Sequence, residues 1–218
     1  CRDLAQHTYN CGLPPLIIAV DQEGGPVARL RHPFTEFAGN ANMAGKRDAD
    51  EFASVTALEL RQVGINMNLA PVMDVVTVDG NEVISDRAYG SDTQLVARLG
   101  VEYLVALQDA GVIATAKHYP GHGPTDVDSH YGLPVVRLPE QELRDVHLGP
   151  FTAAIAAGVD ALMPAHIIYE AWDEWPATLS RRLLTDLLRG ELGFEGVVIT
   201  DDLNMHAISR NYPYPGSL

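Results

Sequence analysis

The sequence of 218 residues predicts an α/β fold in which helices cover a parallel sheet. Short runs of β-branched and other apolar residues alternate with longer segments of helical periodicity along the whole chain. A polar or ionisable residue lies at the end of each short run. This alternation is economical only if successive strands run parallel and the helices return the chain outside the sheet.

Five short apolar runs predict buried parallel strands. They cover residues 16–20, 65–72, 112–116, 159–163 and 196–200. The polar residues near their carboxyl ends are Asp21, Asp74, His118, His166 and Asp201. In a closed barrel all of these ends meet at one mouth, whereas in an open doubly wound sheet only the central ones meet. The pattern therefore favours a (β/α)8 barrel of the TIM type.

Four segments between the strands predict helices. They cover residues 48–63, 95–107, 139–157 and 180–190. The apolar stripes of the first two are formed by Phe52, Val55, Leu58 and Leu60, and by Leu95, Leu99, Tyr103 and Leu107. Gly111 is placed as a stop signal, Ser180 as an N-cap, and Pro150 as a break or kink in the third segment.

The length limits how much of such a barrel is present. A complete eight-stranded barrel needs about 250 residues, and the sequence shows five strands in 218 residues. No linker rich in Gly, Ser or Pro divides the chain. We therefore expect residues 1–218 to form a single barrel domain that is incomplete at both ends.

Composition excludes several classes of protein. Asp and Glu number 29 against 15 Lys and Arg, which gives a net charge of −14 and argues against binding to nucleic-acid phosphates. The longest apolar run is far shorter than the ~20 residues of a membrane span, and no secretory signal opens the chain. Two cysteines cannot form a disulfide framework. Cytoplasmic localisation is the default expectation, and the alternative is a secreted or lipid-anchored protein if a missing N-terminus carried a signal.

The densest cluster of reactive side chains is the loop 117–130, which follows the third strand. Asp128 and His130 are two residues apart in an extended segment, so their side chains are expected to point the same way. A carboxylate beside an imidazole raises its pKa and suits it to deliver a proton. A metal site built from His118, His122 and His130 is the alternative, but the compact His-x-x-x-His pair on a helix is absent, and Gly123-Pro124 interrupts the run. We therefore expect no metal and no other cofactor.

Two further segments carry candidate residues at strand ends. Asp201 comes first after the fifth strand and is the better candidate for a nucleophile, while Asp202 is expected to bind the following backbone; alternatively, the pair caps a helix. Asp21 can accept hydrogen bonds from substrate hydroxyls, and Arg29 can donate them. Arg87 is either a structural ion pair or a donor to the ligand.

Together these segments resemble glycoside hydrolase family 3, and more narrowly its bacterial β-N-acetylglucosaminidase branch. The matching motifs are Ala19-Val20-Asp21-Gln22-Glu23-Gly24-Gly25, residues 64–74, Asp86-Arg87-Ala88-Tyr89-Gly90, Lys117-His118-Tyr119-Pro120-Gly121-His122-Gly123 with Asp128-Ser129-His130, and Thr200-Asp201-Asp202-Leu203-Asn204-Met205. They occur in order across nearly the whole chain, so the set is far more specific than any one motif. Two departures are Pro26, where the family usually has Arg, and Tyr119 in place of Phe.

The resemblance implies a (β/α)8 barrel and a retaining exo-β-N-acetylglucosaminidase that acts on cell-wall or chitin-derived sugars. By position, Asp201 is then the nucleophile and His130, held by Asp128, is the general acid and base. The residues implied to bind the terminal sugar are Asp21, Arg29, Arg87, Lys117 and His118. The alternatives are another activity of the family (β-glucosidase, β-xylosidase or glycoside phosphorylase), a metal-dependent barrel hydrolase, and an inactive sugar-binding fragment. The oligomeric state is not determined by the sequence.

Overall fold

A computed structural model describes residues 3, 10–12, 16–43, 49–78, 81, 83–125 and 129–212. Its centre is a sheet of five strands in the order β1-β4-β5-β7-β9, in which all neighbours are parallel. These strands are β1 Ala19–Val20, β4 Met67–Asn68, β5 Ile113–Tyr119, β7 Ala161–Pro164 and β9 Val197–Val198. Each overlaps one of the five predicted runs, so the prediction of an α/β fold with a parallel sheet is confirmed.

The order of the strands distinguishes a barrel from a doubly wound sheet. Spatial order follows chain order throughout, as it does between successive strands of a (β/α) barrel, and shows no reversal at a switch point. The five described strands form an open sheet and do not close on themselves. β4 is shorter than the predicted run 65–72, and an isolated bridge between Val72 and Lys117 continues the pairing with β5 beyond it.

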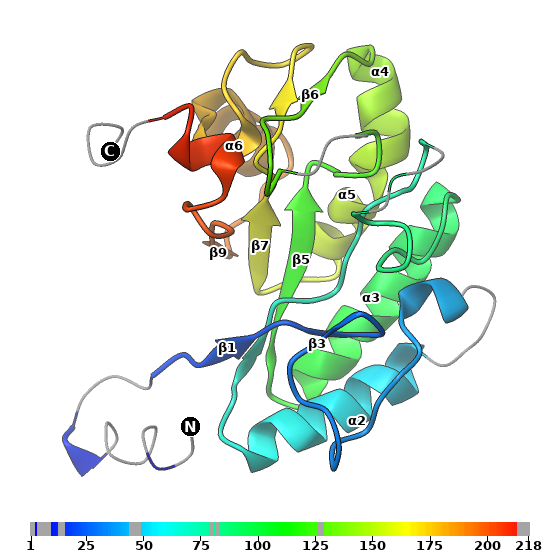
Figure 1. Ribbon diagram of the computed structural model, residues 1–218, viewed down its shortest axis with the longest axis vertical. Coiled ribbons are helices and arrows are strands. Elements are labelled where there is room, and N and C mark those ends of the chain that lie inside the picture. Colours follow the sequence, from blue (N-terminus) through cyan, green and yellow to red (C-terminus); the bar gives the residue numbers. More distant parts are fainter. Residues whose placement is uncertain are drawn as a thin grey trace.

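Helices occupy the four predicted segments, and three short helical elements outside those segments, in the described part of the chain, were not predicted. The helical elements are α2 Ala49–Gln62, α3 Thr93–Asp109, α4 Glu140–Glu142, the π-helical segments η2 Leu143–His147 and η4 Arg182–Glu191, α5 Gly149–Ala156, α6 His206–Ser209, and the short 3₁₀ turns η1 Asn40–Asn42 and η3 Ala177–Leu179. Figure 1 shows α2 and α3 side by side, and α3 also packs against α5 and β5. Among the described residues, none of these helices has the length and apolar character that crossing a membrane requires.

Helix ends follow local chemistry. The Ser180 hydroxyl accepts a hydrogen bond from the Leu183 N–H at 3.0 Å, as predicted for an N-cap. Gly111 has φ +78° after the end of α3, a conformation that suits glycine as a stop. The predicted break in segment 139–157 is also observed: η2 ends at His147, and α5 begins with Pro150 in its first turn, where a missing N–H costs nothing.

One predicted stripe is wrong in part. Phe52 and Leu60 of α2 are buried, but Leu58 is 60% exposed. The buried face of α2 is completed by small residues, Ala53 and Ala57, which continue the helical period from Phe52 to Leu60. Leu58 lies off that face and is exposed to solvent despite its hydrophobic side chain.

Two small sheets stand beyond the carboxyl ends of the central strands. The hairpin β2 Gln22–Gly24 pairs antiparallel with β3 Val27–Ala28, and β6 Val135–Val136 pairs parallel with β8 Ile168–Tyr169. The hairpin turns through Gly24 and Gly25, which have φ +87° and +56°, a backbone conformation that glycine adopts without steric cost. It holds the segment that follows β1 over the mouth of the sheet.

Candidate active site

A cavity of about 230 Å³ lies at the carboxyl ends of the central strands. Residues from segments far apart in the sequence reach it: the ends of β1, β5, β7 and β9, and the loops after β4 and β5. It is lined by seven residues that the sequence predicted as site residues, namely Asp21, Arg29, Arg87, Lys117, His118, His130 and Asp201. The eighth, Asp128, lies outside the described residues. All the predicted site residues that the structure describes therefore share one cavity.

A buried network of charges forms one wall of this cavity. Lys117 Nζ lies 2.8 Å from Asp21 Oδ1 and 2.6 Å from Glu23 Oε1. The Arg87 guanidinium makes a two-pronged contact with Glu23, with Nε 2.8 Å from Oε2 and Nη2 2.9 Å from Oε1. Burial by itself raises the pKa of Glu23, but Lys117 and Arg87 outweigh it and hold that pKa at about 2. Glu23 is therefore ionised and keeps both cations in place at the cavity wall.

Glu23 was not among the predicted site residues, although the sequence contains a signal for it. It comes two positions after Asp21 in an extended segment, so both carboxylates face the same side. Gln22, between them, turns the other way and accepts hydrogen bonds from the Arg29 and Leu30 amides at 2.8 and 3.0 Å. The alternation of β2 therefore explains why the cavity receives Asp21 and Glu23 together.

Lys117 and His118 are consecutive, yet both line the cavity. The pairing of β5 with β7 shifts register between Lys117 and Tyr119, and such an irregularity lets neighbouring side chains face the same side. His118 Nδ1 lies 2.8 Å from Asp74 Oδ2. Burial lowers the pKa of His118 well below its ordinary value, and Arg87 and Lys117 lower it further. His118 is thus a neutral imidazole that donates Nδ1–H to Asp74 and presents Nε2 to the cavity.

Asp74 has a structural part in this arrangement. Its Oδ1 accepts hydrogen bonds from the backbone N–H groups of His118 at 3.2 Å and His122 at 2.7 Å. It is fully buried and does not line the cavity. Asp74 therefore shapes the loop that follows β5, and its place at a strand end does not bring it to the mouth.

The pair Asp201 and Asp202 separates as the sequence analysis expected. Asp201 lines the cavity, whereas Asp202 does not. Asp202 Oδ1 accepts hydrogen bonds from Asn204 N and Nδ2 at 2.9 and 2.7 Å, so this side chain binds the following backbone. His130 reaches the same cavity from the loop after β5.

The alternative metal site lacks a ligand set. His118 Nδ1 is paired with Asp74, and His122 Nδ1 lies 2.8 Å from Thr125 Oγ1. Across residues 16–43, 49–78, 83–125 and 129–212, no group of three His, Cys, Asp or Glu side chains is arranged to hold a metal ion.

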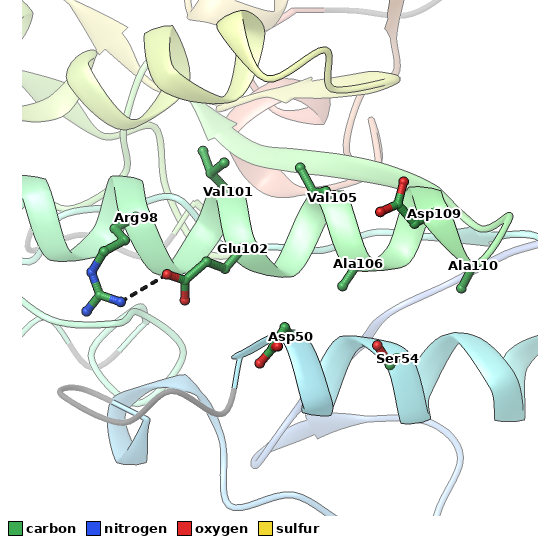
Figure 2. Close-up of a pocket in the computed structure, with 9 residues that line it drawn as sticks. All are labelled: Asp50, Ser54, Arg98, Val101, Glu102, Val105, Ala106, Asp109 and Ala110. Atoms are coloured by element: carbon green, nitrogen blue, oxygen red, sulfur yellow. Dashed lines mark hydrogen bonds and ion pairs between the residues drawn. The ribbon is translucent and has the colours of Figure 1, made fainter.

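A larger hollow, of about 990 Å³, lies between α2 and α3. Figure 2 shows Asp50 and Ser54 on α2 facing residues from Arg98 to Ala110 on α3, with Arg98 and Glu102 paired at 3.1 Å along one helix. The hollow is remote from the strand ends, and its cation is already paired. The smaller cavity is therefore the better candidate for a site of chemistry.

Comparisons with known proteins agree with this placement. The model of the glycosyl hydrolase family 3 N terminal domain matches residues 3–215. A β-hexosaminidase of Pseudomonas aeruginosa is 41% identical over 196 residues, which cover 88% of this chain and 58% of the relative.

Two solved structures extend the comparison. A family 3 β-N-acetylglucosaminidase from Paenibacillus sp. superposes with a TM-score of 0.93 at 48% identity, covering 97% of this chain and 41% of that one. NagZ from Neisseria gonorrhoeae, solved with N-trifluoroacetyl-D-glucosamine, has a TM-score of 0.82 at 36% identity, covering 88% and 60%. The chain thus spans between two fifths and three fifths of these relatives.

Proposed function

The chain belongs to the glycosyl hydrolase family 3 N-terminal domain family, and on that premise we propose that the protein is a retaining exo-β-N-acetylglucosaminidase. Its substrates would be cell-wall or chitin-derived sugars that end in N-acetylglucosamine. Two relatives support this substrate: the Paenibacillus β-N-acetylglucosaminidase and the Neisseria protein, which holds an N-acylated glucosamine.

The observation that carries the proposal is that Asp201 and His130 line one small cavity. A retaining glycosidase needs a carboxylate to attack the anomeric carbon and a proton donor for the leaving oxygen. Asp201, which follows β9, supplies the carboxylate, and His130, in the loop after β5, supplies the proton donor. The cavity is smaller than the ~300–1,000 Å³ of pockets for drug-sized ligands, which suits one terminal sugar and hence exo action.

The reaction proceeds in two steps. In the first, an Asp201 carboxylate oxygen bonds to the anomeric carbon, the glycosidic bond breaks, and His130 gives its proton to the leaving oxygen. In the second, His130 takes a proton from water, the water oxygen bonds to the anomeric carbon, and the Asp201 ester breaks. A neutral imidazole suits this second step because it adds no second anion beside Asp201. Asp128 is the group proposed to orient His130.

The remaining polar residues would bind the hydroxyls of the sugar. Lys117 and Arg87 are fixed by Glu23 and have further donors to offer. Asp21 is only half-buried and can accept from a hydroxyl, and Arg29 lies nearby, with Nη2 3.9 Å from Asp21 Oδ2. His118 Nε2 is an acceptor in the neutral tautomer. A wall of this kind supplies both donors and acceptors, as recognition of a sugar requires.

A panel of aryl β-glycosides tests the proposal on the full-length protein. We expect the N-acetylglucosaminide to be cleaved in preference to the glucoside and xyloside, and water to be preferred to phosphate as acceptor. A preference for glucoside, xyloside or phosphate would assign another activity of the family and overturn the proposal.

Two substitutions test the roles of the residues. Asp201→Asn should abolish turnover of good and poor leaving groups alike, because no glycosyl-enzyme can form. His130→Ala should lower kcat for a poor leaving group by about 10²–10⁴-fold and far less for an activated one. Asp186→Asn and His32→Ala, on exposed residues outside the cavity, are the matched controls. An equal effect of His130→Ala on both leaving groups would contradict its assignment as the acid.

A further inference from the structure

The segment that carries Asp201 is weakly attached to the sheet. The last ladder hydrogen bond of β9 runs from the Ile199 N–H to Leu162 O at 3.0 Å. Within residues 200–205, the backbone then forms a local turn, in which the Met205 N–H donates to Asp202 O at 3.0 Å. The sheet itself therefore does not determine where the Asp201 carboxylate lies.

One side chain connects this segment to the sheet. His166 Nε2 lies 3.2 Å from the backbone oxygen of Asp202. Among the hydrogen bonds of the described residues, it is the only one that joins 200–205 to an element other than the adjoining α6. A carbonyl oxygen has two lone pairs, so Asp202 O can accept from both Met205 and His166.

The ring of His166 is itself held on both sides. Because a backbone oxygen only accepts, Nε2 must carry the proton of this hydrogen bond. On the other side of the ring, Nδ1 lies 2.6 Å from Thr178 Oγ1, and that hydroxyl also lies 3.0 Å from Ala165 O. His166 is 2% exposed and follows β7 by two residues, so it is anchored to a central strand.

From these contacts we propose that His166 is a positioning residue, which holds the Asp201 carboxylate at the place from which it attacks the sugar. The inference rests on the proposed function of Asp201. The chain of contacts begins at β7, passes through the His166 ring and ends at Asp202 O, in the peptide unit after that of Asp201. Thr178 fixes the ring orientation so that Nε2–H points at that oxygen.

Four variants of the full-length protein separate this role from simple packing. His166→Leu removes the donor at similar bulk and should lower kcat about 100-fold, since a misplacement of about 1 Å can cost that much. His166→Gln can still donate to Asp202 O and should recover at least tenfold of that loss. Thr178→Val should lower kcat about tenfold, and Thr178→Ser should stay within about twofold of the wild type.

The split between binding and turnover is the decisive readout. His166 also lines the cavity, but both of its ring nitrogens are engaged with Asp202 O and Thr178 Oγ1. The residues proposed to bind the sugar are unaltered, so the Kd for N-acetylglucosamine should change by less than about threefold in all four variants. Equal loss of kcat in His166→Leu and His166→Gln, or loss of N-acetylglucosamine binding in step with kcat, would overturn the positioning role.

Hydrogen exchange tests the same inference without turnover. The Met205 amide should exchange faster in His166→Leu than in the wild type, while amides of β5 stay unchanged. An unchanged Met205 exchange rate would overturn the inference. Failure of the wild-type protein to cleave N-acetylglucosaminides would instead refute the proposed function, and the exchange result would still stand.

Discussion

Glu23→Gln removes the buried carboxylate that contacts both Lys117 and Arg87. The Glu23 side chain is 1% exposed and contacts both Lys117 and Arg87. Burial opposes its charge, but the two cations lower its pKa from 4.5 to about 2. At 1.36 kcal/mol per pH unit, this difference corresponds to about 3 kcal/mol in favour of the ionised form.

The direction of the pH dependence of stability follows from the difference between the pKa of Glu23 in the folded and in the unfolded protein. Because the pKa of Glu23 is lower in the folded state, the stabilisation is fully present above pH 4.5 and is lost as the pH falls through about 2. At pH 7 Glu23→Gln should therefore lower the free energy of unfolding by about 3 kcal/mol. Between pH 4.5 and 2 the difference between variant and wild type should shrink.

Urea unfolding of both proteins at pH 7 and pH 3 measures this effect. The matched control is Glu36→Gln, because Glu36 forms an exposed pair with Arg31 at 3.1 Å. That pair should contribute less than about 1 kcal/mol. If Glu23→Gln lowers the free energy of unfolding no more than Glu36→Gln does, the view that Glu23, Lys117 and Arg87 form a tightly coupled network is refuted.

Two other predictions concern His147 at the end of η2 and Gly123 in the loop that follows β5. Burial lowers the pKa of His147 to about 4, so the free energy of unfolding should fall by up to about 3 kcal/mol as the pH falls from 6.5 through 4. His147→Leu should abolish that part of the pH dependence of the Tm. An unchanged pH dependence of the Tm would contradict this prediction. A Cβ at Gly123 would lie 1.6 Å from Val75 O, so Gly123→Ala should displace the loop and weaken binding of N-acetylglucosamine by more than tenfold in calorimetry. Gly190→Ala, whose Cβ meets nothing closer than 3.5 Å, is the control, and equal affinity of the two variants would refute the argument.

Much of the site could be located from the sequence because it depends on chain connectivity. Lys117, His118 and Asp201 lie at or just past the ends of apolar runs, and parallel strands bring such ends to one edge. The same reasoning noted His166 at a strand end without giving it a role. Its contact with Asp202 O joins residues 36 positions apart, and no local pattern reports such a contact.

The sequence by itself determined the alternation of strands and helices, the caps and breaks at Ser180 and Pro150, and the family. These features depend on periodicity and on neighbours a few residues away. Only the tertiary structure decided which strand-end residues face the cavity. Asp74 accepts hydrogen bonds from backbone amides and does not reach the cavity, whereas Glu23, which was not predicted as a site residue, forms a charged part of the cavity wall. The physical reason is that burial of a charge is tolerable only beside its partners, and those partners come from distant segments of the chain.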